Sequence, residues 1–168
     1  MISGTVTVAT PEAMRSLGGL LAGDLRAGDL VVLTGDLGAG KTTLTQGIGA
    51  RLGVRGEVTS PTFVIARVHP SLVRGPALVH VDAYRLDSVS EVDDLDLDAS
   101  LADSVTVVEW GEGLVEGLAP DRLELRLTRP HGAAGPDHPE DEGPEPRTVD
   151  IAAFGSRWDG VTLPVMLT

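Results

Sequence analysis

The sequence predicts an α/β sandwich with a mixed central sheet that is parallel in its N-terminal part and antiparallel in its C-terminal strands. Short continuous apolar runs at 30–33, 77–81 and 105–108 are typical of strands buried on both faces. The first run leads directly into a glycine-rich loop and then a helical stretch. Leucines that alternate with charged residues at 123–127 indicate a half-exposed, antiparallel strand. These observations together favour a P-loop NTPase-like architecture.

Length and composition favour one domain over residues 1–168. The chain is 42% hydrophobic and 23% charged, which is ordinary for a globular protein, and it has no cysteine for a disulfide or a thiolate metal site. No apolar run approaches the roughly 18 residues that a membrane-spanning helix needs, and the first residues lack the layout of a signal peptide. We therefore expect a cytoplasmic protein without membrane association.

A strand and two helices are expected in the N-terminal third. Residues 3–9 alternate threonine with apolar side chains, which indicates a strand. Residues 10–12 then supply a hydroxyl cap, a proline at the first helical position and an acid in the first turn. Apolar residues at helical spacing continue to Leu25. After the glycine-rich loop, a second helical stretch extends to Leu52.

The rest of the chain is expected to alternate strands with loops. A strand is predicted at 63–68, one or two short helices in the acidic stretch 87–103, and further antiparallel strands at 149–153 and 161–167. Between the C-terminal strands, residues 130–146 include five prolines, three glycines and five acids. Because this stretch has almost nothing to bury, we expect a flexible acidic loop that is more readily a tolerated insertion than a functional tail.

Residues 35–42 match the phosphate-binding pattern G-x-x-x-x-G-K-[ST] in full, between a predicted strand and a predicted helix. The glycines let the backbone turn so that its N–H groups point at a phosphate, and the helix that begins there adds its positive dipole end. Lys41 would reach the β- and γ-phosphates, and the hydroxyl of Thr42 would ligate Mg²⁺. The motif therefore predicts binding of a nucleotide with Mg²⁺.

Two acids, Asp82 and Glu109, end neighbouring buried strands. The carboxyl ends of parallel strands meet at one edge of a sheet, where carboxylates can hold Mg²⁺ or orient water. For each acid, a purely structural role at the end of a strand stays open.

Four other features allow more than one interpretation. The loop at 59–63 is either a nucleotide-sensing loop or a capped connection into a strand. His80 is interpreted as a packed strand residue rather than a base. Arg85 is either a surface charge or a γ-phosphate partner, and Trp110 is a core, partner-facing or catalytic residue.

Lys41 is the only lysine in the chain, and the formal net charge is −12. A coding bias toward arginine explains the scarcity of lysine, but arginine cannot replace a compact ammonium group against phosphates. A surface this acidic would repel a nucleic-acid backbone, which argues against independent binding of nucleic acid.

Four stretches, taken in their order and spacing, resemble the TsaE (YjeE) family over about residues 1–128. They are GDLGAGKTT at 35–43, SPTF at 60–63, HVDAYR at 80–85 and VEW at 108–110. The resemblance implies a bacterial ATPase needed to form the threonylcarbamoyl modification of adenosine in tRNAs that read codons beginning with A. It also implies action with the partner proteins TsaB and TsaD, in which the ATP cycle supports multiple turnovers. Because the chain is acidic, we expect it to meet tRNA only through that complex.

The resemblance also assigns roles by position. Leu37 to Thr42 would bind the phosphates of ATP, Thr42 and Glu109 would be the Mg²⁺ ligands, and Asp82 would be the Walker-B-like acid beside a switch-like loop at 60–63. The expected catalytic residues are Lys41, Asp82 and Glu109. The expected ATP-binding residues are Gly35, Leu37, Gly38, Ala39, Gly40, Lys41, Thr42 and Thr43.

Three alternative functions are compared with the sequence requirements of each. A small-molecule P-loop kinase needs a lid with basic residues, for which Arg67 and Arg74 are the only central candidates. A regulatory GTPase needs a second lysine in its guanine-reading motif, and the chain has none. A nucleotide-sensing interaction protein with negligible hydrolysis stays open.

Overall fold

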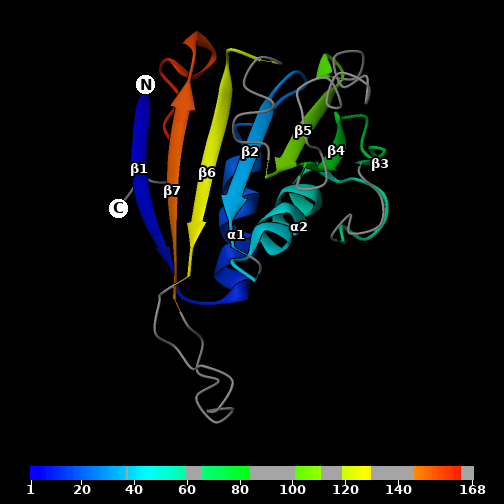
Figure 1. The fold of residues 1–168 in the computed structure, drawn as a ribbon. Helices are drawn as coiled ribbons and strands as arrows, with labels where there is room; N and C mark the ends of the chain where they lie inside the picture. The colour runs from blue at the N-terminus through cyan, green and yellow to red at the C-terminus, as the bar shows by residue number, and fades with distance from the viewer. Residues whose placement is uncertain (37, 60–65, 84–100, 111–118, 130–145, 164–168) are drawn as a thin grey trace.

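The computed structural model describes residues 1–36, 38–59, 66–83, 101–110, 119–129 and 146–163. These residues form a seven-stranded sheet with strand order β1-β7-β6-β2-β5-β4-β3, drawn in Figure 1. The elements are β1 (Ile2–Val8), α1 (Pro11–Ala22), β2 (Leu30–Gly35), α2 (Lys41–Leu52), β3 (Ala66–His69), β4 (Ala77–Asp82), β5 (Ser104–Glu109), β6 (Arg122–Thr128), β7 (Arg147–Phe154) and the short 3₁₀ helix η3 (Ser156–Trp158).

The mixed sheet that the sequence predicts is confirmed. Strand β2 lies parallel to β5 on one side and to β6 on the other, and β4 continues the parallel part beyond β5. Strand β7 is antiparallel to β6, as expected of the C-terminal strands. The first strand, however, belongs to this antiparallel part, because β1 pairs with β7 from Ile2 opposite Ala153 to Val8 opposite Arg147. Strand β3 is antiparallel to β4 at the other edge.

Helices α1 and α2 pack against each other and against one face of the sheet. Their buried side chains, such as Leu17 and Ile48, share one apolar cluster with residues of β2, β5, β6 and β7. The two helices cross where each has a glycine. A Cβ atom on Gly18 would collide with the carbonyl of Leu44, and one on Gly47 would collide with the carbonyl of Arg15. The glycines therefore set how closely the helices approach.

Several predicted elements either have other bounds in the structure or lie outside its described residues. The strand expected at 63–68 is described from Ala66 to His69, while residues 60–65 lie outside the described part. The helices expected at 87–103 lie outside it up to residue 100, and residues 130–145 of the expected acidic loop lie outside it as well. In the described part of the chain, no helix is long and apolar enough to cross a membrane.

The strand expected at 161–167 is wrong for residues 161–163, which form no strand, while residues 164–168 lie outside the described part. The physical reason is that this segment begins in the turn after η3, where the N–H group of Val161 donates to the oxygen of Trp158 at 3.1 Å rather than to a neighbouring strand. Leu163 is nevertheless fully buried in the main apolar cluster. The apolar pattern of residues 161–163 therefore reflects the burial of Leu163 rather than strand pairing.

The close helix crossing gives a test with a matched control. Ala instead of Gly stabilises an open helix position by up to about 1 kcal/mol, but overpacking a contact costs about 1–3 kcal/mol. We expect Gly47→Ala to lower the melting temperature. Gly19→Ala should preserve or raise it, because the nearest atom to a Cβ there is the oxygen of Gly47 at 3.9 Å. Thermal unfolding followed by circular dichroism measures both, and equal melting temperatures would contradict the crossing.

Candidate nucleotide-binding site

The glycine-rich loop joins the end of β2 to the start of α2, at the carboxyl edge of the parallel strands. Gly38 and Gly40 have φ angles of 80° and 108°, in the left-handed region that glycine adopts without steric cost. Gly40 precedes α2 and has no side chain with which to cap it. The first N–H groups of α2 are therefore free of a side-chain cap, and the positive end of the helix dipole lies at the loop. This is the arrangement that binds phosphate groups.

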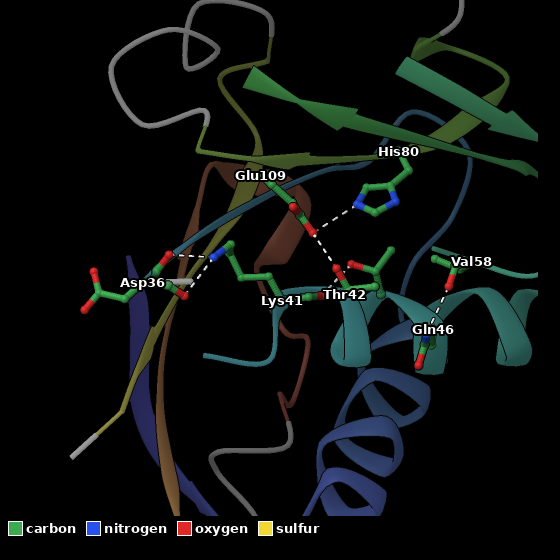
Figure 2. A network of polar contacts seen from close by, with 9 residues as sticks. Asp36, Lys41, Thr42, Gln46, Val58, His80 and Glu109 are labelled. Atoms are coloured by element: carbon green, nitrogen blue, oxygen red, sulfur yellow. Dashed lines mark hydrogen bonds and ion pairs between the residues drawn. The ribbon is translucent and has the colours of Figure 1, made fainter. Parts of the chain in front are cut away.

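Lys41 is the first residue of α2, and its ammonium group turns back toward the loop. Its Nζ donates hydrogen bonds to the backbone oxygens of Gly35 at 2.5 Å and Asp36 at 3.1 Å (Figure 2). The same atom lies 4.3 Å from the ring centroid of Trp110. The side chain is buried, with 7% of the residue exposed. Burial lowers the pKa of Lys41 from its ordinary value, and the negative charge of Glu109 is the largest of the influences that oppose this shift.

Glu109, at the end of β5, accepts hydrogen bonds from two other elements. The hydroxyl of Thr42 on α2 lies 3.4 Å from its Oε1 atom, and Nε2 of His80 on β4 lies 3.1 Å from the same oxygen (Figure 2). The side chains of His80 and Glu109 are 0% and 5% exposed. Because an ionised carboxylate only accepts, we assign the proton to Nε2 of His80. The contacts fix the carboxylate beside the first turn of α2.

Asp82 lies directly opposite Glu109, because β4 and β5 pair in parallel with these two residues in register. Asp82 is 9% exposed. The two acids that the sequence singled out are thus brought together at one edge of the sheet, next to Thr42. A hydroxyl and two carboxylates are hard oxygen donors of the kind that Mg²⁺ prefers.

Trp110 is held in an unusual backbone conformation. Its φ angle is 62°, in the left-handed region that a residue other than glycine rarely adopts, and its N–H group donates to the oxygen of Leu33 at 2.8 Å. This turn at the end of β5 sets the indole ring against Lys41. The sequence left a core, a partner-facing and a catalytic role open for Trp110. Its contact with Lys41 favours a role in the candidate nucleotide-binding site.

The remaining predicted residues fall into two groups. Ala39 and Thr43 lie beside Lys41 on the loop and on α2, and Ala39 is fully buried. Leu37, the switch-like loop at 60–63 and Arg85 lie outside the described residues.

His80 is the residue whose contact sequence reasoning missed. It is packed on a strand as expected, but it also holds Glu109. Two signals were available. His80 is two residues before Asp82 and so shares its face of the strand, and His80 and Asp82 lie on the strand paired with the one that ends in Glu109.

Comparisons with known proteins show the family of the chain. The family model of "Threonylcarbamoyl adenosine biosynthesis protein TsaE" matches residues 8–134. The chain is 60% identical over 154 residues to a Streptomyces coelicolor protein named "tRNA threonylcarbamoyladenosine biosynthesis protein TsaE", covering 91% of this chain and 99% of the relative. A Bacillus subtilis protein of the same name is 36% identical over 150 residues, covering 89% of this chain and 85% of the relative. The crystal structure of Bacillus subtilis YdiB is similar with a TM-score of 0.67 and 28% identity, covering 94% of this chain and 90% of that one.

The buried contact between His80 and Glu109 can be tested by a double-mutant cycle. A hydrogen bond to a charged group contributes about 1.5–3 kcal/mol, so His80→Leu should lower the free energy of unfolding by about that amount, because Glu109 then stays buried without this donor. His80→Gln, which keeps a donor, should cost less. In a Glu109→Leu background, the cost of His80→Leu should largely disappear. Additive costs in urea unfolding would show that the two side chains are not coupled.

Proposed function

The chain belongs to the TsaE family of tRNA threonylcarbamoyladenosine biosynthesis proteins, and from this membership we propose that it binds and hydrolyses ATP with Mg²⁺ in concert with TsaB and TsaD. The observation that carries the proposal is the meeting of three groups at one edge of the sheet. These are the lone lysine at the start of α2, the hydroxyl of Thr42, and the paired acids Asp82 and Glu109. A protein with this role works in the cytoplasm, where tRNA and ATP are found.

The glycine-rich loop would bind the phosphates of ATP. The backbone N–H groups of residues 38–43 and the dipole of α2 attract the phosphate oxygens. Lys41 would exchange its two backbone acceptors, Gly35 and Asp36, for phosphate oxygens. Because the lysine is buried and stacked on Trp110, little water competes for its charge.

Thr42 and Glu109 would hold Mg²⁺, since their oxygens already lie 3.4 Å apart. When bound, the metal supplies positive charge that neutralises the charge developing on the phosphates. His80 keeps Glu109 directed at the first turn of α2. Asp82 is then the carboxylate that is left to orient the attacking water.

Substitution of Lys41 tests the proposed hydrolysis of ATP. Lys41→Ala should abolish ATPase activity, because it removes the only lysine of the chain and with it the buried ammonium group at the start of α2. Arg147 on β7 also contacts the loop, at the oxygen of Gly38, but its guanidinium cannot take the place of that buried ammonium. Lys41→Arg should also lose most activity, because the guanidinium is larger and planar. The measurement is steady-state ATPase with and without TsaB and TsaD, with Arg26→Glu as a remote control on the surface. Turnover of Lys41→Ala equal to that of the unchanged protein would overturn the site assignment.

The same ATPase assay, together with a substrate screen, separates the alternatives. A nucleotide-sensing protein would bind ATP but would show negligible hydrolysis even with both partners present. A small-molecule kinase would transfer phosphate to a metabolite in a substrate screen and would need neither partner.

The acidic charge of the chain predicts how strongly it binds tRNA by itself. With a formal charge of −12, the chain should bind bare tRNA weakly or not at all at physiological salt. In the proposed function, the partner proteins hold the RNA. Fluorescence anisotropy with labelled tRNA measures this directly, and a dissociation constant of micromolar or tighter for the chain alone would contradict the prediction.

A further inference from the structure

Two large aliphatic side chains project into solvent from one tight turn between β3 and β4. Leu72 is 69% exposed and Val73 is 65% exposed, which is unusual for adjacent residues of this type. The turn lies beside the C-terminal end of α2, since the N–H group of Leu72 donates to the oxygen of Gly53 at 2.9 Å. The aliphatic pair thus lies at the opposite end of α2 from Lys41.

The turn is held in a defined conformation. The hydroxyl of Ser71 accepts hydrogen bonds from the N–H groups of Val73 at 3.1 Å and Gly75 at 2.9 Å. Arg74 has a φ angle of 61°, in the left-handed region. Val73 also packs so closely on Gly53 that a Cβ atom there would lie 2.8 Å from its Cγ2. The exposed aliphatic pair is therefore presented by a fixed backbone, as in a preorganised binding surface.

The charge around this turn is opposite to that of the whole chain. Residues 51–76 contain four arginines and one acid, Glu57, in a protein with a net charge of −12. The arginines are exposed, and they are Arg51, Arg55, Arg67 and Arg74. The backbone joins their segments, because the N–H group of Arg55 donates to the oxygen of Pro70 at 2.7 Å. We call these arginines with Leu72 and Val73 the Leu72 surface.

We propose that the Leu72 surface docks a protein partner whose own surface presents carboxylates around an apolar depression. The inference rests on the proposed function, in which this partner belongs to the TsaB–TsaD complex. Charge complementarity argues for an acidic partner, and the exposed aliphatic pair supplies the apolar centre that a protein interface needs. A nucleic acid fits less well, because Leu72 and Val73 offer neither a charge for phosphates nor an aromatic face for bases.

The surface is connected to the candidate nucleotide-binding site by two contacts. Arg67 donates from Nη1 to the hydroxyl of Thr59 at 3.2 Å, and Gln46 in the middle of α2 donates from Nε2 to the oxygen of Val58 at 3.0 Å. A carboxylate that pairs with Arg67 competes with Thr59 for the guanidinium. A docked partner would thereby loosen the contact of Arg67 with Thr59, and Thr59 is next to Val58, which Gln46 of α2 holds.

The test compares binding of the full chain to immobilised TsaB–TsaD complex, with ATP and Mg²⁺ present. The double variant Leu72→Ser/Val73→Ser removes the apolar centre, and Arg55→Glu reverses one charge at its rim. The matched control is Leu20→Ser with Arg26→Glu, because these side chains are also exposed but lie on and after α1. Thermal unfolding checks that each variant is folded.

We expect the serine variant to bind about tenfold or more weakly, and Arg55→Glu to lose affinity most at low salt. The control should bind within about twofold of the unchanged protein. Equal binding by the serine variant, or an equal loss in the control, overturns the docking surface while leaving the proposed function standing. Failure of the unchanged chain to bind the complex overturns both. If the variants instead lose affinity for bare tRNA alone, the surface is a nucleic-acid contact and the proposal is wrong.

Discussion

A carboxylate buried at the end of a strand costs free energy unless hydrogen-bond donors surround it. Glu109 is such a carboxylate, and it receives its donors from two other elements, the hydroxyl of Thr42 on α2 and the ring of His80 on β4. Its charge also partly offsets the effect of burial on Lys41. One buried acid thus links β4, β5 and the start of α2, and it holds the side chains of Thr42 and His80 at the site.

The sheet makes this meeting possible because its parallel strands end at the same edge. Strands β2, β5 and β4 run side by side, so Gly35 at the start of the loop and the acids at the ends of β4 and β5 come together. The antiparallel strands β1, β7 and β3 extend the sheet on both sides. The close crossing of α1 and α2 at Gly18 and Gly47 keeps α2 against that sheet.

Lys41 and the arginines of the Leu72 surface place positive charge at opposite ends of α2. Lys41 is buried at the N-terminal end of α2, where burial strengthens its attraction for phosphates. The arginines of the Leu72 surface are exposed at the other end of the helix, where solvent screens them and they are suited to long-range attraction of a partner. The rest of a chain with a net charge of −12 is correspondingly more acidic.

The sequence by itself determined the mixed sheet, the glycine-rich loop, the lone lysine and the two strand-end acids, because these follow from local patterns of apolar residues and from a contiguous motif. It did not determine that β1 pairs with β7, that residues 161–163 form no strand, or that His80 holds Glu109. Each of these depends on residues far apart in the chain. The tertiary structure decides which strands pair and which side chain contacts a buried charge. The reason is that apolar periodicity indicates that a residue is buried but does not indicate which strand or side chain it packs against.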